Sequence, residues 1–85
     1  EPLVNTVEVN TLAAQIFPNP VQDRLQIQLT TDAKATFLLF NSQGQVLQSG
    51  TFQGQIQLEM ATYPSGLYWL EVQNSEGKAV RKIVK

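Results

Sequence analysis

Apolar and polar residues alternate along much of this chain. The alternation is clearest in LQIQL at 25–29 and IQLEM at 56–60. A third run, YWLEVQ at 68–73, places Tyr, Leu and Val at every second position. Such an alternation puts successive side chains on opposite faces of an extended strand. No long stretch shows the repeat of an amphipathic helix. The pattern therefore predicts an all-β chain.

Turn-forming residues divide this pattern into strand-sized segments. Clusters of Pro, Asn, Asp, Ser, Gly and their polar neighbours occur at 18–20, 31–33, 41–44, 53–54, 64–66 and 74–77. The segments between them predict strands at 12–17, 24–30, 35–41, 45–52, 55–60, 66–73 and 78–84. Seven short strands at this spacing favour an immunoglobulin-like sandwich of two antiparallel sheets, with a small barrel as the alternative.

The phase of each predicted strand indicates which side chains form the core. The positions expected to be buried are Leu25, Ile27, Leu29, Phe37, Leu39, Leu47, Ile56, Leu58, Leu67 or its neighbour Tyr68, Leu70, Val72, Val80 and Ile83. The segment at 37–40, Phe-Leu-Leu-Phe, is apolar in both phases. A strand of this kind lies at the centre of a sheet or is covered on its second face.

A proline-rich motif, Phe17-Pro18-Asn19-Pro20, separates the first two predicted strands. Neither proline has an N–H group to donate to a sheet, and each favours extended backbone in the residue before it. The motif is therefore expected to end one strand, cross an edge of the fold and deliver Leu25 in phase to the next strand. Phe17 is expected to plug one end of the core.

The composition limits the classes of function. The chain has 85 residues, which fits one domain, and it contains neither cysteine nor histidine. It therefore has no disulfide or thiolate metal site, and it lacks the commonest general base and metal ligand. A net charge of −1, with 15% charged residues, argues against a nucleic-acid partner.

The two ends of the chain differ. Residues 1–10 have neither the basic start nor the apolar segment of a signal peptide, and no apolar run is long enough to span a bilayer. Glu1 stands where a methionine would begin a complete chain, which suggests a fragment or a processed piece. The basic residues Lys78, Arg81, Lys82 and Lys85 crowd the other end. They indicate either a solvated last strand whose lysines protect its edge, or a strand that meets an acidic partner.

Side chains suited to catalysis are scattered. The serines, at positions 42, 49, 65 and 75, fall mostly in turns and have no histidine as a base. The carboxylates considered are Asp23, Asp32, Glu59, Glu71 and Glu76. They fall in turns or on polar strand faces and suggest no convergent acid–base pair. We therefore expect no enzyme activity, no catalytic residue and no cofactor. A calcium site at Asn19, Asp23 and Asp32 is conceivable, but the spacing matches no known calcium loop.

A carbohydrate-binding face is the stronger alternative. Trp69 is expected to be exposed by its phase, and an exposed indole ring stacks well on a sugar. Tyr63 or Phe52 would extend such a platform. A single exposed aromatic residue is, however, more often part of a cross-strand pair.

Several motifs occur together in an order that resembles a known family. FPNP precedes an alternating strand, ATFLLFNSQGQVL combines a strand with a polar turn, YPSGLYWLEV follows, and the basic strand GKAVRKIVK closes the series. The order resembles the C-terminal sorting domain of proteins exported by the type IX secretion system of Bacteroidota, the type A or Por-type domain. The resemblance covers residues 16–85, and residues 1–15 look like a linker.

The resemblance implies an immunoglobulin-like fold and a function without chemistry. In that family the domain directs an attached N-terminal cargo protein from the periplasm through the outer membrane. A surface sortase usually removes the domain, in this chain within the linker. The cargo is then secreted or stays on the cell surface, where it can be anchored to lipopolysaccharide. The expected partners are the type IX components, the sortase and the cargo. A weak homodimer through a free edge strand is also plausible.

The resemblance also assigns roles to residues. The segment thought to be recognised by the machinery corresponds to Gly77, Lys78, Arg81, Lys82, Ile83, Val84 and Lys85. The positions expected to shape the fold are Phe17, Pro18, Asn19, Pro20, Gly44, Gly66 and Tyr68. Tyr63 stands where the family often has leucine, and it is expected to pack equally well. A carbohydrate-binding or adhesive module that stays on its parent enzyme is the main alternative, followed by a passive spacer.

Overall fold

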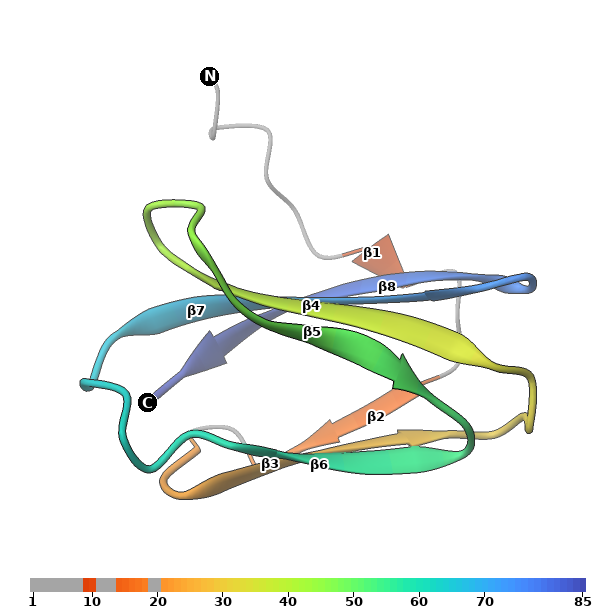
Figure 1. Cartoon of the computed structure of the whole chain (residues 1–85), viewed down its shortest axis with the longest axis horizontal. Coiled ribbons are helices and arrows are strands. Elements are labelled where there is room, and N and C mark those ends of the chain that lie inside the picture. Colours follow the sequence, from red (N-terminus) through yellow and green to blue (C-terminus); the bar gives the residue numbers. More distant parts are fainter. Residues whose placement is uncertain (1–8, 11–13, 19–20) are drawn as a thin grey trace.

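Two antiparallel β-sheets face each other as the layers of a sandwich (Figure 1). The computed structural model describes residues 9–10, 14–18 and 21–85. The five-stranded sheet has the order β1 (Val9–Asn10), β8 (Gly77–Val84), β7 (Leu67–Asn74), β4 (Ala35–Asn41) and β5 (Val46–Phe52). The three-stranded sheet has the order β2 (Ala14–Phe17), β3 (Arg24–Leu29) and β6 (Gln55–Glu59). The predicted sandwich is confirmed, and the barrel alternative is excluded.

Each of the seven predicted strands is present, and an eighth was not predicted. The missed strand is β1, whose two residues pair with β8 through Val9–Val80 and Asn10–Ala79. So short a segment leaves no alternation to detect. The described part of the chain contains no helix long and apolar enough to cross a membrane.

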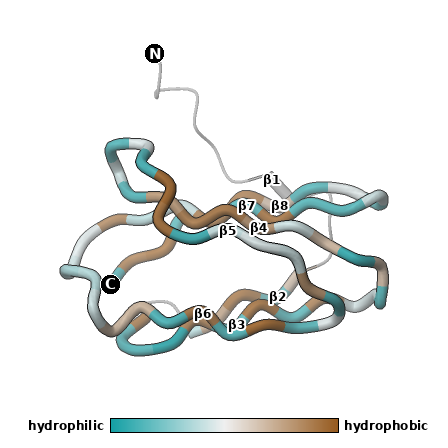
Figure 2. The backbone as a smooth tube through the Cα atoms, viewed as in Figure 1, coloured by the Kyte–Doolittle hydropathy of each residue, from teal (hydrophilic) through white to brown (hydrophobic). Residues whose placement is uncertain are grey.

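The core lies between the two sheets. In Figure 2 the tube alternates between hydrophobic and hydrophilic colours along β3 and β6, and the buried residues of these strands supply the core from the smaller sheet. The buried side chains are Val21, Leu25, Ile27, Leu29, Ala35, Phe37, Leu39, Phe52, Leu58, Met60, Tyr68, Leu70, Val72, Ala79 and Ile83. Leu47 and Ile56 are partly buried against this cluster. Between Leu67 and Tyr68, the tyrosine is the buried residue.

Two core predictions were wrong. Val80 is only partly buried and lies on the outer side of β8, because it is three residues from Ile83 and therefore in the opposite phase. Ala79 is buried in its place. Phe17 does not plug the core: it lies opposite Gln26 on the outer side of β2 and is 43% exposed.

The connection that follows β2 begins with a cis peptide bond between Phe17 and Pro18. Asn19 and Pro20 lie outside the described residues. Val21 is buried, and its amide donates to the carbonyl of Val84 at 2.8 Å. This contact ties the connection between β2 and β3 to the end of β8.

β4 is an interior strand of the larger sheet, paired with β5 on one side and with β7 on the other. Phe37 and Leu39 point into the core, while Leu38 and Phe40 point outward. The central-strand explanation for the doubly apolar segment is therefore confirmed. The second face of β4 is not covered within the domain, because the outward residue Leu38 is 37% exposed.

Candidate recognition surface

The predicted recognition segment is divided by the pleat of β8. Ala79, Arg81 and Ile83 share the inner phase, and Lys78, Val80, Lys82 and Val84 share the outer phase. Ile83 is fully buried in the core. Ile83 is therefore inaccessible to a partner in the folded domain, although the resemblance placed it in the recognised segment.

The other predicted recognition residues outside the outer phase also have internal contacts. Arg81 points along the inner side at the rim of the sandwich, where its Nη2 lies 3.5 Å from the carbonyl oxygen of Ala14 in the opposite sheet. Gly77 is the first residue of β8, and its amide donates to Asn74 Oδ1 at 3.2 Å. The Lys85 ammonium donates to three backbone carbonyls of the loop between β6 and β7. These contacts give the three residues roles in the fold itself.

The outer phase of β8 continues into an apolar surface across the neighbouring strands. Lys82 lies beside Trp69, Trp69 beside Phe40, and Phe40 beside Val46 across a β-bulge. We call the surface the outer apolar face, and it comprises Lys78, Val80, Lys82, Val84, Leu67, Trp69, Glu71, Leu38, Phe40 and Val46.

This face carries most of the exposed apolar bulk in the described part of the domain. Val46, Val84, Leu67 and Leu38 are 52%, 42%, 39% and 37% exposed, and they make up four of the five large hydrophobic side chains that are exposed. The fifth is Phe17. Contiguous exposed apolar surface on a small domain indicates an interaction site.

The charges on the outer apolar face are few. Lys78 Nζ lies 3.4 Å from Glu71 Oε2, with the two side chains 45% and 24% exposed. A partly exposed pair of this kind contributes little to stability. Lys82 is exposed next to Trp69 and leaves the face with one more positive than negative side chain. The face therefore suits a partner that is apolar and weakly acidic.

The opposite surface of the sandwich is chemically different. Gln26 Nε2 donates to Gln55 Oε1 at 3.0 Å, and Gln57 Nε2 donates to Gln26 Oε1 at 3.1 Å. Arg24 and Glu59 form an ion pair beside them. Neutral amides that bind one another keep this part of the smaller sheet hydrated, and Phe17 is its one exposed large hydrophobic side chain among the described residues.

The aromatic residues proposed for a carbohydrate platform do not share a surface. Trp69 lies partly exposed on the outer apolar face, whereas Phe52 is buried with its ring edge against Phe37. Tyr63 packs on the Tyr68 ring in the loop before β7, with 5.9 Å between ring centroids. Neither Tyr63 nor Phe52 therefore extends a platform at Trp69, while Tyr63 packs against the core as expected.

The residues considered for metal binding and acid–base chemistry are also apart. Asp23 and Asp32 flank opposite ends of β3, and Asn19 lies outside the described residues. In the described ranges no three potential ligands gather. Glu59 pairs with Arg24, and Glu76 accepts a hydrogen bond from Thr31 Oγ1 at 3.1 Å. These carboxylates form separate surface contacts.

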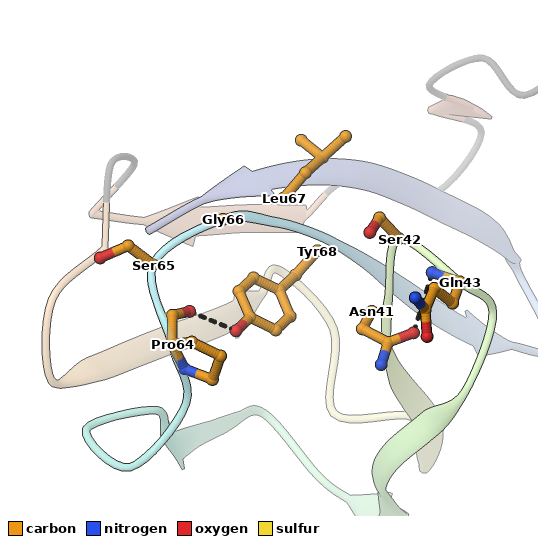
Figure 3. Close-up of a pocket in the computed structure, with 8 residues that line it drawn as sticks. All are labelled: Asn41, Ser42, Gln43, Pro64, Ser65, Gly66, Leu67 and Tyr68. Carbon is orange, nitrogen blue, oxygen red and sulfur yellow. Dashed lines mark hydrogen bonds between the residues drawn. The ribbon is translucent and has the colours of Figure 1, made fainter.

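A small hollow of about 240 Å³ lies at the end of the larger sheet (Figure 3). Tyr68 and Leu67 point to opposite sides of β7 there, and the Tyr68 hydroxyl donates to the carbonyl of Pro64. On the other side, Asn41 Oδ1 accepts from the amides of Gln43 and Gln45. The polar groups of the hollow thus hold the two turns that form it.

Gly44 and Gly66, two of the positions expected to shape the fold, have backbone conformations or hydrogen bonds that explain this role. Gly44 has a φ of 87° in the turn between β4 and β5, the left-handed conformation predicted for it. Gly66 makes a reciprocal pair of backbone hydrogen bonds with Lys85, each 2.9 Å long.

The fold resembles those of two solved structures. One is a DUF3244 family protein from Bacteroides vulgatus with an immunoglobulin-like β-sandwich fold, with a TM-score of 0.73 and 17% identity over 87% of this chain and 85% of that one. The other is dimeric latent PorU from Porphyromonas gingivalis, with a TM-score of 0.57 and 14% identity. That match covers 93% of this chain but 9% of PorU. At these identities the likeness establishes the fold alone.

The family is established by the sequence comparison and not by the likeness of folds. No curated protein matches the sequence. Residues 15–85 match the sequence model of the family described as the secretion system C-terminal sorting domain, Por_Secre_tail. This match spans the sandwich from β2 to β8 and agrees with the motifs found in the sequence. The chain belongs to the family of secretion system C-terminal sorting domains.

Proposed function

We propose that the type IX secretion machinery recognises this domain through the outer apolar face, and that the domain thereby directs an attached cargo protein out of the cell. Membership of the family supports the general role, which is that of a type IX sorting signal with no catalysis of its own. The same membership implies export to the cell surface or into the medium.

One observation favours this surface over the rest of the domain. The outward residues of β8, the strand that carries the family's basic motif, coincide with the largest group of exposed apolar side chains among the described residues. Burial of apolar area drives most protein association. An exposed lysine beside Trp69 adds electrostatic preference for an acidic partner. The opposite, glutamine-rich sheet has one exposed large hydrophobic side chain among its described residues, Phe17, against four on the outer apolar face.

The finer steps follow from the family role. The cargo precedes the domain in the chain and crosses the periplasm with it. A surface sortase then cuts within residues 1–15, and the cargo is released or anchored to lipopolysaccharide. Residues 16–85 are the sorting domain proper in this proposal. Strands β1 and β2 show that backbone pairing with the sandwich already occurs at Val9–Asn10 and Ala14–Gln15, so we place the cut before Val9.

A fluorescent reporter fused ahead of residues 1–85, in a host with a type IX system, tests the proposal. The double variant Leu67→Ser with Val84→Ser removes two apolar side chains from the outer apolar face. Gln28→Ser with Gln57→Ser is the matched control on the opposite sheet. We expect the first variant to leave the reporter in the periplasm and the control to be exported.

Circular dichroism and thermal unfolding of both purified domains must show that they are folded. Normal export of a folded Leu67→Ser, Val84→Ser domain would refute recognition through this face. Deletion of residues 81–85 should also retain the reporter in the periplasm. A weak homodimer remains a further proposal, which sedimentation of the purified domain tests directly.

A further inference from the structure

We propose that Lys85 acts as a positioning residue: its ammonium fixes the end of β8 against the loop between β6 and β7 and so holds one corner of the outer apolar face in place. The inference rests on the proposed function, because it concerns how the recognised surface is maintained. It assigns Lys85 a role inside the domain in place of direct contact with the machinery.

The ammonium group lies among three backbone oxygens. Lys85 Nζ donates to the carbonyls of Met60 at 2.6 Å, Ala61 at 3.1 Å and Tyr63 at 2.6 Å. We call this arrangement the carbonyl seat. A lysine ammonium has three N–H donors, and the seat offers one acceptor to each. Hydrogen bonds that involve a charged group are stronger than neutral ones, so this contact outweighs an ordinary surface interaction.

The seat joins segments that are distant in the sequence. The Lys85 amide donates to the Gly66 carbonyl and the Gly66 amide donates to the Lys85 carbonyl, both at 2.9 Å. One residue earlier, the Val84 carbonyl accepts from the amide of Val21. The end of β8 is thereby connected to the loop before β7 and to the connection before β3.

The seat adjoins the proposed recognition surface. Val84 precedes Lys85 and pairs with Leu67, which follows Gly66. Val84 and Leu67 are both exposed on the outer apolar face. Without the ammonium, three carbonyl dipoles would converge on one point with no cation or donor between them. The loop would then move away, and the Val84–Leu67 pair would lose its support.

The chemistry of the seat favours lysine over arginine. An ammonium is a compact point charge whose donors are arranged tetrahedrally, whereas a guanidinium is a planar fork suited to carboxylates and phosphates. Lys85→Arg keeps the positive charge but does not match three carbonyls around one nitrogen. A partner that required only charge at this position would accept the arginine.

Amide hydrogen exchange of the 85-residue domain tests the seat without any partner. In Lys85→Met, the amides at positions 21, 66 and 85 should exchange about tenfold faster than in the unmodified domain, the change expected from losing about 1.4 kcal/mol of local stability. Amides of the central β4–β7 pair should be unaffected. Lys82→Met removes the same charge from the outer apolar face and should leave the three amides unchanged.

Chemical complementation provides a second measurement. Lys85→Ala removes the atoms equivalent to n-propylammonium. Added n-propylammonium chloride should restore slow exchange at positions 21 and 66, whereas n-propanol and sodium chloride at matched concentrations should not. Restoration by all three additives, or by none, would contradict a seat that is specific for an ammonium group.

Export of the reporter fusion then separates this inference from the proposed function. We expect Lys85→Met and Lys85→Arg to export less reporter than the unmodified domain. Unchanged exchange in Lys85→Met, or faster exchange with normal export, overturns the positioning role while leaving recognition through the outer apolar face intact. Different variants test the proposed function itself. Normal export of the folded double variant Leu67→Ser with Val84→Ser, and of Lys82→Met, would refute it.

Discussion

Ile83 and Val84 are adjacent in the family's basic motif, yet the structure predicts opposite consequences of mutating them. Ile83 is fully buried, and Val84 is 42% exposed. Ile83→Ala removes three carbon groups from the core, which amounts to about 2.4 kcal/mol at roughly 0.8 kcal/mol per group. The cavity left behind increases the loss, and we expect about 3–4 kcal/mol in total.

Such a loss is a large part of the stability of a domain of this size, which is about 4–13 kcal/mol at typical values per residue. Urea unfolding followed by Trp69 fluorescence measures it. With a slope of about 1 kcal/mol per molar urea, the midpoint should fall by about 3–4 M. Val84→Ala should change the free energy of unfolding by less than about 0.5 kcal/mol, as is usual for surface substitutions.

The two variants should separate in the export assay as well. At a temperature where both domains are folded, Val84→Ala should reduce export while Ile83→Ala should not, because only Val84 lies on the outer apolar face. A loss of stability below about 1 kcal/mol for Ile83→Ala would contradict the burial on which the reasoning depends. Equal destabilisation by both substitutions would contradict the assignment of inner and outer phases in β8.

Three further predictions concern stability alone. Gly44→Ala should destabilise the domain by about 1 kcal/mol, because alanine is strained at a φ of 87°; thermal unfolding measures the change, and an unaltered midpoint would contradict it. Tyr68→Phe should cost about 1 kcal/mol, since the hydroxyl that donates to the Pro64 carbonyl is lost from a buried ring; urea unfolding tests this, and a gain in stability would be unexpected. Arg24→Ala should change the free energy of unfolding by less than about 1 kcal/mol, because Arg24 and Glu59 are 65% and 66% exposed; a larger loss at both low and high salt would show that the pair is more than a surface contact.

Local patterns were sufficient to predict seven of the eight strands in the described part of the chain. Alternation and turn residues are properties of short segments, and they report directly on the pleat and on where it is interrupted. The order of the strands in each sheet depends on contacts between distant segments, so the pairings of β7 with β4 and of β1 with β8 were not predictable in this way. Phe17 illustrates the same limit, because its side chain follows the pleat of β2 although an apolar residue beside a proline suggested a plug.

The candidate site was predicted at the level of a strand but not of its residues. The motif identified β8, and its own alternation contained the signal that Ile83 points inward while Lys82 and Val84 point outward. Val80 and Ile83 are three residues apart, so a strand cannot direct both of them into the core, and the prediction that it does contradicts this alternation. The doubly apolar segment at 37–40 was the one sequence signal of the outer apolar face, because it has apolar residues in both phases. The carbonyl seat of Lys85 could not be predicted from the sequence, because it requires a loop from another part of the chain to lie beside the end of β8.

The short pairing of β1 with β8 has a mechanical consequence. Among the described residues it consists of two pairs, Val9–Val80 and Asn10–Ala79, whereas the β2–β3 ladder has four. A pulling force applied through the N-terminal segment reaches β1 first and opens these pairs before it loads the longer ladder. Under tension β1 can thus separate from β8 while the strands from β2 to β8 stay folded.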